Sequence, residues 1–179
     1  SQNNIPLFAE TFGCSPDLLA QAPGRLEVLG NHTDYNEGFV LSTAVNCTTQ
    51  ISFRKIEGDT CKVSSPFMND GIREFNLNEI VSPADGKDWT NYIRGVIVAL
   101  KKRKLNITAF QALVTSDVPL SAGMSSSASL EMALVTGLDE LFGFDLDIKS
   151  KALIGQDCEN NYIGANTGLM DQLTSLSGL

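Results

Sequence analysis

Residues 119–131 read PLSAGMSSSASLE and join a turn rich in glycine and serine to an apolar repeat of helical spacing. A helix N-terminus leaves backbone N–H groups without partners and carries a partial positive charge, so phosphate is stabilised there. Gly123 would let the backbone approach such a ligand, because glycine lacks a Cβ. Ser125, Ser126 and Ser127 add hydroxyl groups for phosphate oxygens, a magnesium ion or the helix cap. The segment predicts a phosphate-binding loop, and its composition leaves a linker or a simple cap open as the alternative.

This loop differs from the loop of P-loop proteins. It has no Gly-Lys-Ser/Thr sequence, and no lysine lies between Pro119 and Asp147 to hold the β- and γ-phosphates. The apolar residues that follow predict a helix from Ala128 that stops at Gly143.

The length of 179 residues suits one substantial core, or one domain with part of another. A net charge of -8 and a pI near 4.5 argue against a nucleic-acid partner. No apolar stretch approaches the ~20 residues of a membrane span, and the N-terminus lacks the apolar core of a signal peptide. Four cysteines without CxxC spacing and a single histidine favour a reducing, cytoplasmic setting over a zinc site.

The apolar pattern predicts an α+β sandwich, because strands come mostly before helices without regular βαβ alternation. A first amphipathic helix is expected to place Ile5, Leu7, Phe8 and Phe12 on one side. Expected strands lie at 22–30, with a break at Gly24, and at 39–44, 48–54, 60–64, 71–77 and 110–115. Expected later helices lie at 88–102, 128–142 and 148–161.

Residues 24–38, GRLEVLGNHTDYNEG, gather planar hydrogen-bonding groups and carboxylates between glycines. A carboxylate can accept hydrogen bonds from two adjacent sugar hydroxyls while amide and imidazole groups fill the other positions, so this mixture suits a polyhydroxylated ligand. The same residue types suit a solvated turn with a structural histidine, and composition leaves both interpretations open.

Asp171 lies in the sequence Gly-Leu-Met-Asp-Gln, between a glycine turn and an apolar run. It could cap a helix or act as a partly buried base, and spacing does not decide between them. If Asp171 met Arg25 in space, the guanidinium would keep the carboxylate ionised and could bear on a transferring phosphoryl group.

Together these segments resemble the GHMP small-molecule kinases, and within that family the galactokinases. Residues 24–35 are similar to a signature of Gly-Arg, an apolar stretch and Gly-Glu-His-Thr-Asp-Tyr-Asn. Residues 119–129 look like the second family motif, and GLMDQ at 168–172 resembles Gly-Ile-Met-Asp-Gln. WTNYIRGV at 89–96 matches a further galactokinase-like run, and the order and spacing agree along the chain.

The resemblance implies catalytic roles for Asp171, beside the attacking sugar hydroxyl, and for Arg25, near the transferred phosphoryl group. Whether the aspartate removes the proton or orients the hydroxyl stays open, and in both versions catalysis is mostly positioning and charge neutralisation. The implied sugar-binding residues are Arg25, Asn31, His32, Asp34 and Asp171.

ATP and Mg²⁺ are the implied cofactors. The resemblance implies that Gly123, Ser125 and Ser126 hold phosphates and that Trp89 lies near the adenine. Ser127 and Glu159 would hold the magnesium ion.

The resemblance further implies a two-layer sandwich of the ribosomal protein S5 domain 2-like type, with residues 1–179 as the N-terminal domain of the kinase. Similar kinases have a second domain with another glycine-rich motif, and residues 173–179 end in an apolar run without a clear stop. We therefore expect that the chain was cut from a longer one and that the fragment alone is inactive.

Two positions depart from the galactokinase pattern. Asn31 replaces the usual glutamate, and Glu27 stands where asparagine is common. An amide at Asn31 loses the charge, so the preference among sugars could shift. Galactose phosphorylation at the anomeric 1-hydroxyl is the leading prediction. A kinase for N-acetylgalactosamine, arabinose or galacturonate, or an inactive sensor of sugar and ATP, remains the alternative.

Overall fold

The computed structural model describes residues 4–29, 41–80, 82–83, 88–119 and 124–178. Its centre is a mixed five-stranded sheet in which only the β3–β5 pair is parallel. In spatial order the strands are β1 (Leu18–Leu29), β2 (Leu41–Lys55), β5 (Phe110–Ser116), β3 (Thr60–Ser64) and β4 (Ile72–Asn76). This architecture confirms the predicted α+β class.

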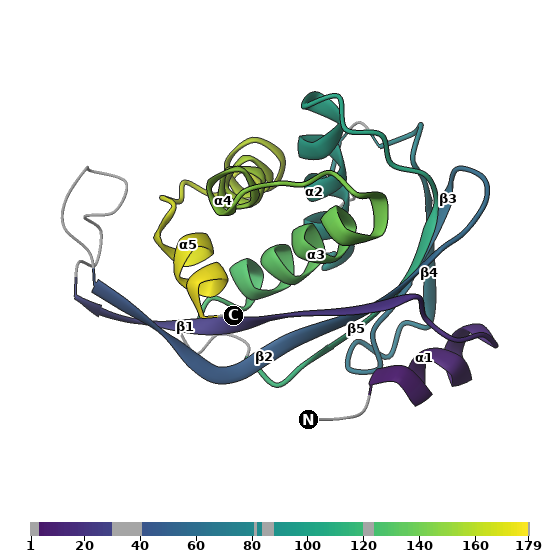
Figure 1. Ribbon diagram of the computed structural model, residues 1–179, viewed down its shortest axis with the longest axis horizontal. Helices are drawn as coiled ribbons and strands as arrows, with labels where there is room; N and C mark the ends of the chain where they lie inside the picture. The colour runs from purple at the N-terminus through teal and green to yellow at the C-terminus, as the bar shows by residue number, and fades with distance from the viewer. Residues whose placement is uncertain (1–3, 30–40, 81, 84–87, 120–123, 179) are drawn as a thin grey trace.

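Helices lie on both faces of the sheet, but unequally (Figure 1). One face carries α2 (Thr90–Lys102), α3 (Ser126–Phe142), α4 (Ile148–Asp157) and α5 (Met170–Ser177). The other face carries α1 (Asn4–Phe12), which contacts β2 and β5. In the described part of the chain, no helix has the length and apolar composition needed to span a bilayer.

Helix α1 is anchored by one apolar and one polar side chain. Phe8 is fully buried, and the Nδ2 of Asn4 donates hydrogen bonds to the backbone oxygens of Gln50 and Leu113. The prediction that Ile5 shares the buried side is wrong, because this side chain is 48% exposed.

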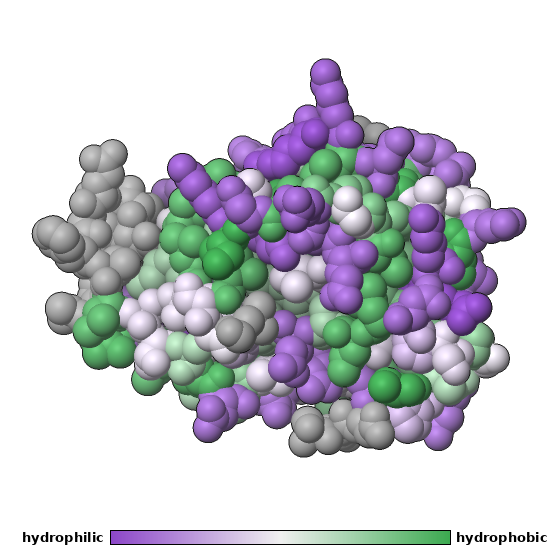
Figure 2. All heavy atoms as spheres, viewed as in Figure 1, coloured by the Kyte–Doolittle hydropathy of each residue, from purple (hydrophilic) through white to green (hydrophobic). Residues whose placement is uncertain are grey.

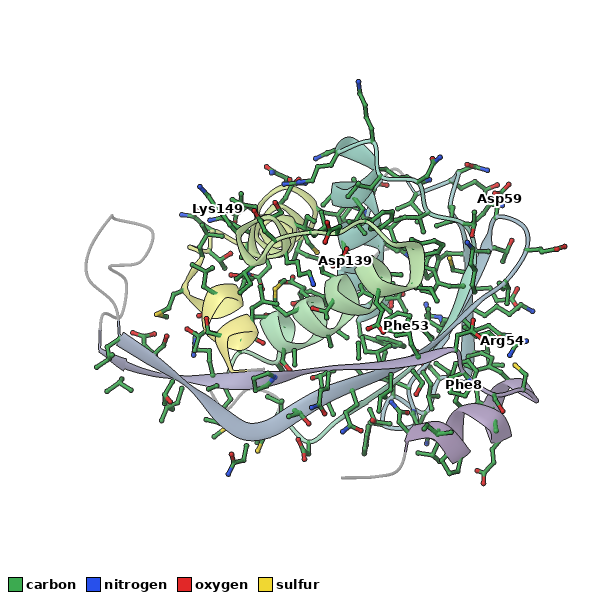
Figure 3. All side chains as sticks on the ribbon, in the orientation of Figure 1. Phe8, Phe53, Arg54, Asp59, Asp139 and Lys149 are labelled. Carbon is green, nitrogen blue, oxygen red and sulfur yellow. The ribbon has the colours of Figure 1, made fainter. Side chains whose placement is uncertain are left out.

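Helix α3 packs on the sheet where Phe53 of β2 meets Gly137. Phe53 is fully buried and lies between α3 and the sheet (Figure 3). A Cβ at Gly137 would lie 2.2 Å from Cε2 of Phe53, so only glycine allows this approach. The helix ends as predicted, because Gly143 adopts a left-handed φ of 67° directly after Phe142.

Two predicted boundaries are wrong, the first of them because of pairing between strands. Residues 41–44 and 48–54 of the two expected strands belong to one strand, β2, because β1 pairs with it from Leu18↔Phe53 to Leu29↔Leu41, and residues 39–40 lie outside the described residues. The helix expected at 148–161 ends at Asp157 and continues as a π-helical segment, Cys158–Ile163. The break expected at Gly24 is a shift of register inside β1, between Pro23 and Arg25.

The helical layer encloses a carboxyl group at Glu131 of α3, which is fully buried. Its Oε2 accepts a hydrogen bond of 3.4 Å from Nε2 of Gln172, and its Oε1 has no partner among the described residues. Burial raises the pKa of Glu131 well above its usual value, and the nearby Glu159 carboxylate raises it further. Glu131 is therefore held as the neutral acid over a range of pH in which an exposed glutamate is ionised.

Replacement of Glu131 by glutamine should remove a pH dependence of stability. In the wild type, the unfolded chain loses this proton above its usual pKa of 4.5 while the native state keeps it. The free energy of unfolding should therefore fall as pH rises, by up to about 1.4 kcal/mol per pH unit, until the native pKa is reached. In Glu131→Gln this decline should be absent. Urea unfolding measured between acidic and neutral pH tests it.

The exposed carboxylate of Glu140 on the same helix offers a matched control. Glu140→Gln should follow the wild-type pH dependence. Parallel curves for the wild type and Glu131→Gln would show that Glu131 is ionised in the native protein.

Candidate functional site

Arg25 and Asp171, which lie 146 positions apart in the sequence, form a two-point ion pair. The Nε of Arg25 lies 2.5 Å from Oδ1 of Asp171, and Nη2 donates to Oδ2 over 2.9 Å. Arg25 follows the register shift of β1, and Asp171 lies in the first turn of α5. The side chains are only 12% and 21% exposed, so the packing around them holds this ion pair in a defined position.

The backbone of β1 also meets the segment that leads into α3. Arg25 N donates a hydrogen bond of 3.1 Å to the backbone oxygen of Met124. A Cβ at Gly24 would lie only 2.9 Å from that oxygen and 3.0 Å from Cγ1 of Val118. Gly24 is therefore required for close contact between β1 and the start of α3.

Ser125 is the residue before α3, and its φ of 47° is left-handed. Its Oγ donates a hydrogen bond to Oδ2 of Asp171. A left-handed serine is uncommon and costs free energy, which this contact with the ion pair helps to offset. The sequence prediction assigned Ser125 to phosphate, whereas its hydroxyl here bonds the carboxylate.

Ser127 and Glu159 form a second pair of oxygen groups. Ser127 Oγ in the first turn of α3 donates a 2.7 Å hydrogen bond to Oε1 of Glu159. Glu159 is 5% exposed and belongs to the π-helical segment, whose end is closed by Gly164 N bonding to the backbone oxygen of Glu159. π-Helical segments are rare in proteins, and those that occur are often found at functional sites. Hydroxyl and carboxylate oxygens are the ligand types that Mg²⁺ prefers.

A pocket of about 570 Å³ opens beside this pair. Trp89 before α2, Tyr92 in α2 and Leu130 in α3 supply much of its apolar lining, and Ser126 and Ser127 supply hydroxyl groups. The remaining lining residues come from β2, from β5 and the segment after it, and from the turn between β3 and β4: Thr49, Ser65, Phe67, Met68, Val114, Ser116 and Val118.

The predicted site residues thus divide into three sets. Arg25, Asp171 and Ser125 form one hydrogen-bonded group, and Ser127 and Glu159 form another. Trp89 and Ser126 line the pocket. Asn31, His32, Asp34 and Gly123 lie outside the described residues.

Two features of the site were absent from the sequence prediction. Gln172, next to Asp171, donates to the buried Glu131, four residues along α3 from Ser127. Asp70 accepts a hydrogen bond from the indole of Trp89. The buried Glu131 could have been predicted, because it is a glutamate inside an otherwise apolar helical repeat. No sequence pattern around Asp70 indicates its contact with Trp89.

Two family models match the segments that contain these residues. The model of the GHMP kinases N terminal domain matches residues 91–179, and the model of the galactokinase galactose-binding signature matches residues 6–55. The first match contains the α3, Glu159 and Asp171 segments, and the second contains Arg25.

Solved structures have the same fold. A Lactococcus lactis galactokinase complexed with galactose is 37% identical with a TM-score of 0.88, and the match covers 95% of this chain and 44% of that one. A Methanococcus jannaschii mevalonate kinase, 21% identical, has a TM-score of 0.77 over 89% of this chain and 51% of that one. The second likeness shows the fold alone, and this chain spans about half the length of these structures or less.

These likenesses confirm the expected sandwich of the GHMP kinase N-terminal domain. The two family models together match most of the chain, and their matched segments contain the ion pair and both serine contacts. The chain therefore belongs to the GHMP kinase family and carries the galactose-binding signature of galactokinases.

Proposed function

We propose that this chain is the N-terminal domain of an ATP-dependent galactokinase, which phosphorylates the anomeric 1-hydroxyl of galactose. The observation that carries the proposal is the position of the Arg25–Asp171 pair, joined by Ser125 to the same helix start that bears Ser127. The Asp171 carboxylate, which could accept a hydrogen bond from a sugar hydroxyl, thus lies at the same end of α3 as the Ser127 and Glu159 oxygens, which could hold a metal–phosphate group. The galactose-binding signature at residues 6–55 and the likeness to a galactose-bound galactokinase support the choice of sugar.

Asp171 is suited to orient a sugar hydroxyl. A carboxylate has about four acceptor positions, and three donors, two from Arg25 and one from Ser125, already occupy Asp171. The remaining position can accept one hydrogen bond from the attacking hydroxyl. Arg25 holds the carboxylate in place, and its positive charge bears on the phosphoryl group as it is transferred.

The residues at the start of α3 suit magnesium-bound phosphate. Ser127 Oγ and Glu159 Oε1 are already 2.7 Å apart and would hold the ion from opposite elements. When bound, Mg²⁺ would supply positive charge that offsets the negative charge developing on the transferred phosphoryl group. Backbone N–H groups at the helix start would contact the phosphates, and the pocket lined by Trp89 would take the base.

A second domain is part of the proposal. The chain spans 44% of the similar galactokinase, and Leu26, Val28 and Leu41 are between 44% and 56% exposed at the end of the β1–β2 pair where Leu29 pairs with Leu41. Figure 2 shows hydrophobic surface at this end of the molecule. Exposed apolar side chains that gather beside a site commonly mark a protein interface.

We also propose a reducing, cytoplasmic setting. The cysteines Cys14, Cys47, Cys61 and Cys158 are free thiols. Cys61 and Cys158 are fully buried in the core, and burial raises the pKa of Cys61 to about 12. Such thiols are unreactive, which is consistent with structural packing in a reducing compartment.

A sugar panel tests the proposed substrate. A polypeptide that carries this chain and extends to the length of the similar galactokinases should release ADP from magnesium–ATP with galactose. N-acetylgalactosamine, arabinose and galacturonate should react at least about tenfold more slowly, because unpaired polar groups penalise the wrong sugar. Turnover of another sugar without galactose would contradict the assignment. Binding of sugar and ATP without ADP release would indicate a sensor.

The 179-residue chain by itself should show no galactose-dependent ADP release. The proposed second domain would supply part of the nucleotide and sugar contacts, and without it the substrates are not held in reacting geometry. Coupled ADP assays of the short and extended polypeptides at equal concentration give the comparison. Equal rates would show that the described domain is sufficient.

Asp171→Asn should lower kcat of the extended polypeptide by at least about 10²-fold. The amide loses the charge that pairs with Arg25 and places either its oxygen or its NH₂ group against the guanidinium, whereas much of the sugar site is untouched. Galactose binding, measured by calorimetry, should therefore remain detectable.

Asp139→Asn is the matched control for this variant. Asp139 is also a little-exposed carboxylate, pairing with Lys151 Nζ at 2.9 Å, but it lies outside the proposed site. Its replacement should leave kcat near the wild-type value. An unchanged kcat in Asp171→Asn as well would assign Asp171 a structural role only.

A further inference from the structure

The turn between β3 and β4 joins the pocket through two exposed apolar side chains. Phe67 and Met68 both line the pocket, yet they are 57% and 40% exposed. Side chains with so much exposure contribute little packing that could hold the turn in place. Some other contact must therefore position residues 65–71 against α2.

That contact is a cluster of three charged residues, which we call the Asp70–Arg73–Asp88 cluster. Arg73 donates from Nη1 to Asp70 Oδ2 over 3.0 Å and from Nη2 to Asp88 Oδ2 over 2.6 Å. Asp70 Oδ2 also accepts a 3.0 Å hydrogen bond from Nε1 of Trp89. One carboxylate thus joins the β3–β4 turn to the aromatic residue at the start of α2.

The other end of the cluster is fixed by the helix itself. Oδ1 of Asp88 accepts hydrogen bonds from the backbone N and the Oγ1 of Thr90, at 2.9 and 2.7 Å, and so holds the first residue of α2. Burial opposes ionisation of Asp88, but the hydrogen bonds from Thr90 and Arg73 outweigh it and lower the pKa of this carboxyl. Asp88 therefore stays ionised and paired with Arg73 near neutral pH.

We propose that Asp70 is a positioning residue for the base of the bound nucleotide. Its carboxylate orients the Trp89 indole and, through Arg73, holds Phe67 and Met68 on the same side of the pocket. Two aromatic rings and a thioether then form a surface that suits the flat face of a purine. This inference rests on the proposed function, because it takes the pocket to be the nucleotide site.

The chain offers a direct reporter, because Trp89 is its single tryptophan. Asp70→Ala removes both contacts of the carboxylate, whereas Asp70→Asn keeps an acceptor for the indole and loses the charge that pairs with Arg73. Glu74→Gln is the matched control, because it breaks the exposed Lys62–Glu74 pair of 3.1 Å on the same hairpin, away from the pocket. Thermal unfolding of each variant checks that the fold is kept.

In the ligand-free 179-residue chain, Asp70→Ala should shift the emission of Trp89 and increase its quenching by acrylamide. In titrations with magnesium–ATP, its Kd should rise about tenfold, with a smaller rise for Asp70→Asn and none for Glu74→Gln. The Kd for magnesium–tripolyphosphate, which lacks a base, should stay unchanged in all variants. This difference between ATP and tripolyphosphate would not arise from a general loss of structure.

Wild-type affinity for ATP in Asp70→Ala would overturn the inference, as would an equal loss of affinity for ATP and tripolyphosphate. Failure of the ATP-binding part of the proposed function has a different signature. In that case the wild-type chain and the extended polypeptide would both bind no ATP, whatever the variants do.

Discussion

The position of α3 on the sheet depends on the absence of a side chain at Gly137. A Cβ there would lie 2.2 Å from a ring carbon of Phe53, so any larger residue would lift the helix from β2. Nearer its N-terminus the same helix is fixed by Ser129, whose Oγ donates to the backbone oxygen of Ala22 over 2.7 Å. One apolar and one polar contact therefore set both the height and the direction of α3.

The geometry of the candidate site depends on the position of α3, because most of the hydrogen bonds in the site have one partner in α3 or in the residues just before it. Its start meets Arg25 through Met124 and Asp171 through Ser125, and its first turn meets Glu159 through Ser127. Asp171 and Glu159 come from different elements that pack against α3 or against its neighbours. The geometry of the carboxylates is therefore a consequence of helix packing, and shifts of α3 would disturb both of them together.

The sequence predicted the parts of this structure that local signals determine. The α3 stop at Gly143 and the strand Thr60–Ser64 were predicted correctly, because a left-handed glycine and β-branched residues act within a few positions. The continuity of β2 was missed, since pairing with β1 decides it and local polarity does not.

The same limit applies to the site. The Arg25–Asp171 contact could be stated only as a condition, because it joins residues 146 positions apart. Asp70 and Trp89 lie 19 positions apart, and Asp70 belongs to none of the motifs that resemble the family, so no sequence pattern predicted their contact. Residue type can predict the chemistry of a side chain, but its partner depends on how the elements pack.

In an acidic chain that is proposed to bind a triphosphate, carboxylates near the phosphates must be neutralised or paired, because they would otherwise repel the ligand. Three carboxyl groups lie near the start of α3 or on its neighbours, and each has a different environment. Asp171 is paired with Arg25, and burial raises the pKa of Glu131 so that it keeps its proton. Within the described part of the chain no cation forms an ion pair with Glu159, which has only the Ser127 hydroxyl. Glu159 is thus the one of these three carboxylates whose charge no described residue offsets, and the magnesium site proposed above uses this carboxylate.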